Sequence, residues 1–151
     1  MWIIAGEPSS CWTVARGSRG RVLVMKLLLV DDNPDMLMAL GHLLRRDFLI
    51  VGALTTGASV LTQVDELNPD IILLDVALGD LNGFQVAERL KRRACPSKIV
   101  FLSAHENSEF LRAAADIGAS GYVFKSQIGR DLIKALQTVT TGGQFFPTSK
   151  N

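Results

Sequence analysis

Four short apolar segments of this chain have the length of a β-strand, and each leads into a reactive side chain. The predicted strands span residues 28–32, 71–75, 99–103 and 121–125, and the side chains in which they end are Asp31 with Asp32, Asp75, Ser103 and Lys125. Unbroken apolar segments are typical of strands that are covered on both faces of a parallel sheet. Because the carboxyl ends of parallel strands share one edge, where ligands bind, the sequence predicts one site with carboxylates, a hydroxyl and an ammonium group.

The segments between these strands have the pattern of helices. Residues 48–54 predict one further strand, and the amphipathic spacing predicts five helices, at 34–44, 58–67, from 84 onward, 108–117 and about 129–141. Asn33-Pro34 is a typical helix start, and Gly118 is a typical helix end. Five strands that alternate with five helices predict one α/β domain with right-handed crossovers.

Composition is that of a folded domain without a nucleic-acid-binding surface. The 151 residues are enough for one domain but short for two. Apolar residues make up 48% and charged residues 21%, which are ordinary values for a globular protein. Because the net charge is only +1, we expect no direct DNA binding by this chain. The basic residues within 89–93 are expected to form a solvated helix face.

The two ends of the chain differ from its centre. Residues 1–24 contain three of the 16 basic and one of the 15 acidic residues, so they carry a positive excess that the rest of the chain lacks. Met25 lies just before the first clean strand. We therefore expect 1–24 to be a disordered or mis-started extension, 25–143 to be the folded domain, and 144–151 to be a C-terminal tail or the start of a linker.

The cysteines and the lengths of the apolar segments predict a cytoplasmic protein. Cys11 and Cys95 form neither a disulfide framework nor a metal-ligand spacing, which fits a reducing compartment. No apolar segment approaches the roughly 20 residues of a membrane span, and the N-terminus lacks the basic region of a secretory signal. No membrane partner is expected.

The carboxylates of the predicted site would repel one another at neutral pH. Such a cluster is unfavourable unless a cation neutralises it or some carboxyl groups hold protons. Mg²⁺ suits a site with few protein carboxylates, because it keeps several waters and shares phosphate oxygens. Lys125 and Ser103 are suited to phosphoryl oxygens, and an aspartate can itself be the nucleophile in phosphoryl transfer. Each residue alone has an ordinary structural explanation. Four strands that end in this set, in the order that the chemistry needs, favour the functional explanation.

Residues 25–147 resemble the receiver domain of two-component response regulators. The resemblance lies in the acidic motif at 29–33, in Asp75 with Gly83 eight residues later, and in Ser103 and Lys125, which are 22 residues apart. Residues 115–125 are similar to the NarL/FixJ-type branch in particular. The resemblance implies a flavodoxin-like, doubly wound five-stranded parallel sheet with five helices and strand order 2-1-3-4-5, an order for which a receiver is a standard example.

The resemblance also implies a role for each acidic residue. Asp75 would accept a phosphoryl group from a phosphohistidine on a histidine kinase or a phosphotransfer protein. Mg²⁺ would be bound by Asp75, by Asp32 directly, by Asp31 mainly through water, and by the backbone carbonyl of Ala77.

Three further positions follow from the same resemblance. Ser103 and Lys125 would hold the phosphoryl oxygens, and movement of Ser103 would let Tyr122 swing inward and reshape the face that partners bind. A homodimer is compatible with these roles. Gly79 and Ser126 stand where the family commonly has proline, and Gly79 should loosen the turn after Asp75.

These expectations describe a signalling switch that catalyses only its own phosphorylation and dephosphorylation. The alternative is the regulatory part of a LuxR/NarL-type DNA-binding transcription regulator whose helix-turn-helix domain is absent from this chain. Phosphatases that use an aspartyl nucleophile generally need a carboxylate two residues further on, where this chain has Ala77. A flavin-binding relative would need backbone amides, rather than Asp31 and Asp32, after the first strand. Neither of these last two functions is expected.

Overall fold

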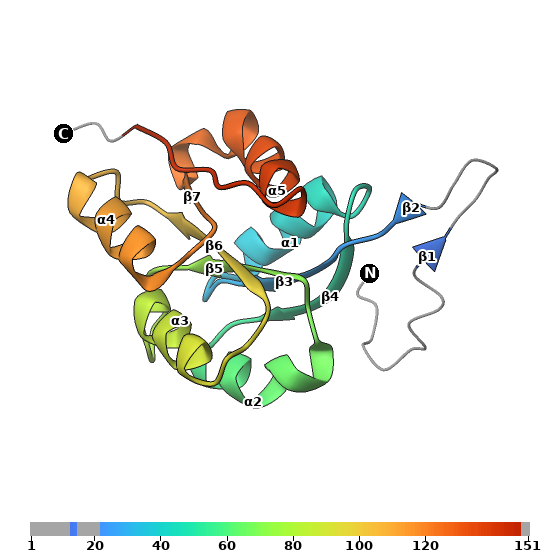
Figure 1. The fold of residues 1–151 in the computed structure, drawn as a ribbon, viewed down its shortest axis with the longest axis horizontal. Helices are drawn as coiled ribbons and strands as arrows, with labels where there is room; N and C mark the ends of the chain where they lie inside the picture. The colour runs from blue at the N-terminus through green and yellow to red at the C-terminus, as the bar shows by residue number, and fades with distance from the viewer. Residues whose placement is uncertain (1–12, 15–21, 149–151) are drawn as a thin grey trace.

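A five-stranded parallel sheet with helices on both faces forms the centre of the structure (Figure 1). The computed structural model describes residues 13–14 and 22–148. The strands are β3 (Lys26–Val30), β4 (Leu49–Leu54), β5 (Ile71–Asp75), β6 (Lys98–Ser103) and β7 (Gly121–Phe124). All neighbouring strands in the order β4-β3-β5-β6-β7 are parallel. Counted from β3, this confirms the order 2-1-3-4-5.

Five α-helices connect or follow these strands. They are α1 (Pro34–Leu44), α2 (Gly57–Leu67), α3 (Gly83–Arg92), α4 (Ser108–Ile117) and α5 (Ile133–Thr140). The Asn33 side chain accepts the N–H of Asp35 at 2.9 Å, so the predicted start of α1 is confirmed. Gly118 ends α4 in the left-handed conformation, with φ +92°, which also confirms the expectation.

The last strand and the last helix differ from their predicted bounds. β7 pairs with β6 only as far as Phe124, so Lys125 lies just beyond the strand and not in it. Lys125–Gln127 form a 3₁₀ turn and Ile128–Leu132 a π-helical turn, and regular α5 begins only at Ile133. The helix expected from about residue 129 is therefore irregular at its start.

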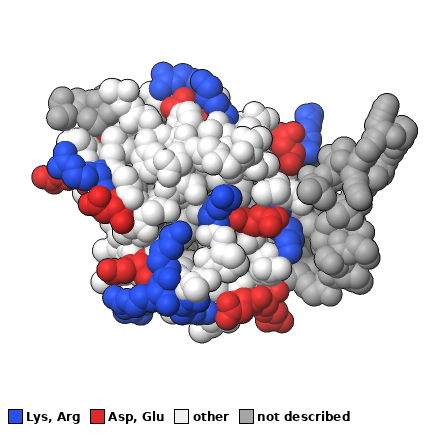
Figure 2. Space-filling view, in the orientation of Figure 1, with Lys and Arg blue, Asp and Glu red and all other residues white. Residues whose placement is uncertain are grey.

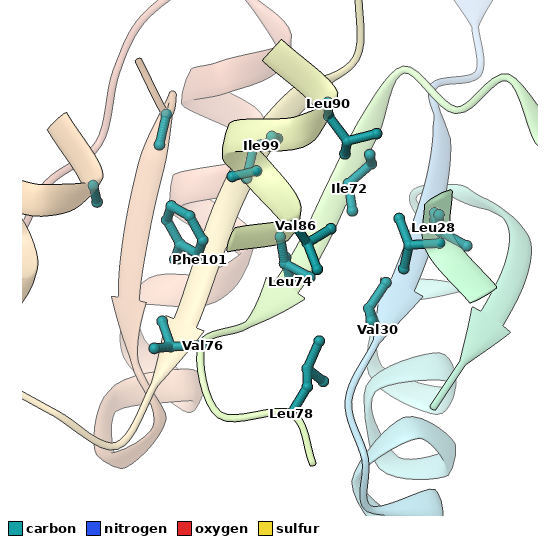
Figure 3. Close-up of a cluster of buried hydrophobic side chains, with 14 of the residues drawn as sticks. Leu28, Val30, Ile72, Leu74, Val76, Leu78, Val86, Leu90, Ile99 and Phe101 are labelled. Atoms are coloured by element: carbon teal, nitrogen blue, oxygen red, sulfur yellow. The ribbon is translucent and has the colours of Figure 1, made fainter. Parts of the chain in front are cut away.

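Side chains of the strands alternate between two hydrophobic clusters, one on each face of the sheet. In β3, Leu28 and Val30 point to the face covered by α2, α3 and α4, while Leu27 and Leu29 point to α1 and α5. All four side chains are at most 2% exposed. Figure 3 shows the first cluster, in which β3, β5 and β6 contribute side chains to a layer packed beneath α3. Burial on both faces explains why the strands are apolar throughout.

The surface of α3 carries the basic residues expected there. Lys and Arg side chains gather over this helix, at the lower left of Figure 2, and residues 91–93 are all exposed. Arg92 pairs with Glu88 at 4.0 Å, and Arg93 pairs with Asp65 at 3.0 Å. The expectation of a solvated helix face is confirmed.

The two ends of the chain are described only in part. The extension expected at 1–24 lies mainly outside the described residues, which include the antiparallel pair β1 (Thr13–Val14) and β2 (Val22–Leu23). After α5, Phe145 forms a parallel bridge with Gly121 of β7, so the described part of 144–151 begins against the sheet. Within the described residues, no helix has both the length and the apolar character needed to span a membrane.

Candidate functional site

The reactive side chains expected at the strand ends meet at one edge of the sheet. Asp31 follows β3, Asp75 is the last residue of the neighbouring β5, and Lys125 follows β7. The Nζ atom of Lys125 lies 3.1 Å from Asp31 Oδ2 and 3.2 Å from Asp75 Oδ2. The exposed fractions of Asp31 and Asp75 are 0% and 2%. One ammonium group therefore links two buried carboxylates.

A third carboxylate makes this site suitable for a cation. One carboxylate oxygen from each of Asp31, Asp32 and Asp75 lies within 4.8 Å of the other two. Asp31 Oδ2 is buried and is paired with Lys125 by distance, but it makes no hydrogen bond of acceptable geometry with any described residue. A buried carboxylate oxygen without a hydrogen bond is unfavourable. A hard cation with oxygen ligands would satisfy it, so the three carboxylates fit Mg²⁺.

The acidic residues are not fully balanced by the one lysine. Burial raises the pKa of the Asp75 carboxyl from 3.8 to about 6, and the nearby Asp31 carboxylate adds to the rise. The Ala77 N–H, which donates to Asp75 Oδ1 at 3.1 Å, and the Lys125 ammonium group both oppose the rise. Burial also lowers the pKa of Lys125, but Asp75 and Asp31 outweigh burial and place it above its ordinary value. Near neutral pH, protons and cations therefore compete for Asp75.

Ser103 lies at the same edge but faces a different set of groups. It ends β6, is 1% exposed, and its Oγ atom accepts the N–H of His105 at 2.9 Å. The Tyr122 hydroxyl donates to the His105 carbonyl at 2.9 Å. Burial raises the pKa of Tyr122, and the Ser103 hydroxyl opposes that rise. Tyr122 is fully buried, so it occupies the inward position in this structure.

Aromatic contacts hold Tyr122 in this position. Its ring centroid lies 6.3 Å from that of Phe101, which lies 4.9 Å from Phe84, which in turn lies 5.6 Å from Phe110. His105 stacks on Phe110 at 4.4 Å, and its carbonyl accepts the Tyr122 hydroxyl. These contacts form a closed circuit through β6, β7, α3 and α4, so movement of Tyr122 must disturb the packing of all four elements.

The backbone at Gly83 packs against the backbone of Asp75 and Val76 so closely that only glycine fits. The Gly83 N–H donates to the Val76 carbonyl at 2.7 Å. A Cβ atom at position 83 would overlap the carbonyl oxygen of Asp75 and would lie 2.9 Å from the Cα atom of Val76. The close approach of these two segments explains the spacing between Asp75 and Gly83 that the sequence shows.

We expect Gly83→Ala to lower the free energy of unfolding by about 2 kcal/mol or more, because the added methyl group displaces backbone at the Asp75 site. Urea unfolding at constant pH measures the change. Gly79→Ala is the matched control, since a Cβ at position 79 meets no atom within 4 Å. Equal stability of the two variants would contradict the close approach.

Asp80 is a residue of the site loop whose role the sequence did not predict. Its two carboxylate oxygens accept the N–H groups of Gly57 and Ala58 at 2.9 Å each. These two hydrogen bonds, the largest causes, lower the pKa of Asp80 to about 2. Asp80 thereby attaches the loop after Asp75 to the N-terminus of α2, which opposes the loosening expected from Gly79. The partners lie 23 and 22 residues away in the chain, so the only signal in the sequence is the helix start near residue 57.

The remaining expected residues lie around the mouth of the site. Ala77 is exposed and touches Asp75 through its N–H. The Ser126 hydroxyl donates to the carboxylate of Glu106, which joins the turn after Lys125 to the loop after β6. The structure thus brings Asp31, Asp32, Asp75 and Lys125 together. Ser103, at the end of β6, and Tyr122, in β7, are joined through the backbone of His105.

Comparison with known sequences identifies similar proteins. A family model described as the response regulator receiver domain matches residues 27–137. The DNA-binding transcriptional activator EvgA of Escherichia coli (strain K12) is 34% identical over 128 residues, which are 84% of this chain and 63% of EvgA. The nitrate/nitrite response regulator protein NarL of the same strain is 30% identical over 118 residues, 77% of this chain and 55% of NarL. The chain therefore spans less than two thirds of these relatives.

Solved structures show the same fold. A two-component response regulator of the LuxR family from Aurantimonas sp. SI85-9A1 has a TM-score of 0.77 at 25% identity, and the match covers 81% of this chain and 89% of that one. The isolated REC domain of RcsB from Salmonella enterica serovar Typhimurium, solved with the phosphomimetic BeF₃⁻, has a TM-score of 0.76 at 25% identity, with coverage of 82% and 94%.

Proposed function

Since the chain belongs to the response regulator receiver family, we propose that it is a signalling switch that accepts a phosphoryl group on Asp75. The observation that supports this most is the convergence of three carboxylates and one ammonium group at the end of β5. The donor is a phosphohistidine on a histidine kinase or a phosphotransfer protein. The Asp75 carboxylate attacks the phosphorus, an O–P bond forms, and the N–P bond of the donor breaks.

Lys125 and Ser103 hold the oxygens of the transferred group. The Lys125 Nζ already lies 3.2 Å from Asp75 Oδ2, where it can balance charge on a phosphoryl group bound there. The Ser103 Oγ accepts the His105 N–H, and its hydroxyl can donate to a phosphoryl oxygen. Catalysis of this kind is mainly positioning and charge stabilisation.

The cation is Mg²⁺, held by the carboxylates and by one backbone oxygen. Asp75 and Asp32 would bind it directly, Asp31 would act mainly through water, and the backbone carbonyl of Ala77 would complete the protein ligands. Bound there, the cation neutralises charge on the phosphoryl group. The buried Oδ2 atom of Asp31, which has the Lys125 ion pair but no hydrogen bond of acceptable geometry, supports a cation at this position.

The output of the switch is a change in partner binding. Ser103 and Tyr122 are joined through the backbone of His105, so a shift of Ser103 toward the phosphoryl group acts on Tyr122 and on the face beside α4 and β7. The partner for that face is a second copy of the chain or an output protein. Regulation of a DNA-binding domain is the alternative hypothesis, and direct DNA binding by this chain is not expected.

Incubation with Mg²⁺ and acetyl phosphate tests the acceptor. We expect the intact protein to gain about 80 Da, the mass of one phosphoryl group, and Asp75→Asn to gain nothing. Omission of Mg²⁺ is expected to prevent the gain in the wild type. Equal labelling of wild type and variant, measured by intact mass, would exclude Asp75 as the acceptor.

A further inference from the structure

The outer edge of β7 is covered by the C-terminal segment of the chain. Residues 144–147, here called the covering segment, run back past α5 and lie beside β7 (Figure 1, red). The Phe145 N–H donates to the Ser120 carbonyl at 3.0 Å, and the Tyr122 N–H donates to the Phe145 carbonyl at 2.9 Å. The covering segment therefore forms a minimal sixth strand, parallel to β7.

The end of α5 turns the chain toward this edge. Gly142 has a φ of +94°, its N–H donates to the Val139 carbonyl at 3.0 Å, and the Gly143 N–H donates to the Thr138 carbonyl at 2.9 Å. This is a Schellman motif, which ends a helix sharply and sends the chain in a defined direction. The covering segment is thus guided to β7 by its own local structure.

Both faces of the sheet receive one aromatic ring from the covering segment. Phe145 packs with the cluster beneath α1 and α5, whereas Phe146 packs with the opposite cluster, which contains Tyr122 and Phe124. A Cβ atom at position 121 would lie 3.2 Å from the Phe145 carbonyl oxygen, so Gly121 permits the close approach. Tyr122 and Phe146 consequently share one face at the same edge of the sheet.

The attachment of the covering segment is limited. A cavity of about 410 Å³ lies between it and the start of the last helix, lined by residues that include Gln127, Arg130, Lys134 and Pro147. Each of residues 144–147 is at least partly exposed. Two backbone hydrogen bonds and two half-buried rings hold the segment, which is consistent with a unit that detaches before the domain unfolds.

We propose that docking of the covering segment and the inward position of Tyr122 depend on each other, so that the segment carries the state of the site to the C-terminal end of the domain. β7 is the edge strand of the five-stranded sheet, and the Tyr122 side chain shares one hydrophobic cluster with Phe146. Tyr122 contacts the site loop through its hydroxyl and the covering segment through its N–H. A change that stabilises the inward position of the Tyr122 ring therefore also stabilises docking of the covering segment, and a change that stabilises docking stabilises the inward ring.

Phe146→Ala tests the mutual dependence without reference to phosphorylation. Tyr122 is the only tyrosine of the chain, so its nitration by tetranitromethane reports the exposure of this ring alone. We expect about 10-fold faster nitration, together with about 10-fold faster hydrogen exchange of the Tyr122 and Phe145 amides, because the open state becomes more populated. Faster amide exchange with unchanged nitration would overturn the proposal, as would no change in either rate.

A glycine pair provides a second test that removes no side chain. Gly121→Ala places a methyl group against the Phe145 carbonyl and is expected to raise both rates as well. Gly129→Ala is the matched control, since a Cβ there meets no atom within 4 Å, and it should leave both rates unchanged. If Phe146→Ala does not fold, this pair decides: equal rates in the two variants would overturn the proposal.

The connection to the phosphoryl site rests on the proposed function. If phosphorylation favours the inward position of Tyr122, it is expected to slow hydrogen exchange of the Phe145 amide several-fold. The same treatment should leave this exchange rate unchanged in Asp75→Asn. A gain of mass at Asp75 with unchanged exchange would overturn transmission through the segment. Absence of any mass gain would contradict the proposed function alone, because the Phe146→Ala result stands independently.

Discussion

Asp75→Asn is expected to raise the free energy of unfolding at pH 7.5, in the absence of Mg²⁺, by about 1–3 kcal/mol, even though it removes the acceptor. The reason is the cost of a buried carboxylate beside another one. Burial raises the pKa of Asp75 from 3.8 to about 6, with Asp31 adding to the rise. A rise of this size means that ionised Asp75 lowers the free energy of unfolding by at most about 3 kcal/mol. Asparagine does not ionise, so the variant does not carry this cost.

The same pKa determines how the effect changes with pH. The folded protein binds the Asp75 proton more tightly than the unfolded chain does, so its ionisation destabilises the fold fully above pH 6 and not at all below 3.8. As the pH falls through this window, the contribution of Asp75 makes the wild type more stable. The advantage of the variant should therefore shrink steadily from pH 7.5 to pH 4.5.

Urea unfolding with a chelator present, at pH 7.5 and pH 4.5, measures both effects. Asp116→Asn is the control, since Asp116 is exposed on α4, and its effect should stay within about 0.5 kcal/mol. Mg²⁺ should stabilise the wild type more than Asp75→Asn, because the variant lacks one ligand. A variant that is less stable than the wild type at pH 7.5 would show that Asp75 is not under electrostatic strain.

Lys125→Met is expected to have the opposite effect and to lower stability at pH 7.5 by roughly 3 kcal/mol. Lys125 is the ammonium group placed within 3.2 Å of both buried carboxylates. Without it, the buried carboxylates of Asp31 and Asp75 face each other, and removal of one partner of a buried charge pair leaves the other uncompensated. Methionine keeps most of the apolar stem, so the loss reports the charge.

Mg²⁺ should recover much of this loss, because a divalent cation replaces the missing positive charge. Thermal unfolding with increasing Mg²⁺ is the measurement, and the increase in Tm should be larger in Lys125→Met than in the wild type. Lys134→Met, on the exposed face of α5, is the control and should behave as the wild type does. A Lys125→Met protein of wild-type stability without Mg²⁺ would remove the lysine from the charge balance of the site.

Local patterns predicted most of the elements of this fold. Ser108–Ile117 and Ile71–Asp75 have the predicted bounds, because the first is closed by a capping glycine and the second is apolar until its last residue. The end of β7 was predicted one residue too late, since the departure of Lys125 into a 3₁₀ turn depends on the register with β6. Local sequence contains caps and periodicity but not register between strands.

The site was predicted to the extent that it follows from strand ends. Asp31, Asp32, Asp75 and Lys125 were expected together and lie together. Asp80 was not expected, because its partners belong to a helix whose start is distant in the chain. A hydrogen bond between one side chain and a distant backbone group leaves no periodic pattern in the sequence, so patterns of neighbouring residues do not predict it.

By itself, the amino-acid sequence determined that strands and helices alternate here and that acidic and basic side chains follow the strands, because both are properties of neighbouring residues. Only the tertiary structure decided that Tyr122 is held inside by a circuit of rings, that Asp80 attaches the site loop to α2, and that the segment at Phe145 lies along β7. These contacts join residues that are far apart in the chain. The residues come close to one another only when helices pack on both faces of the sheet.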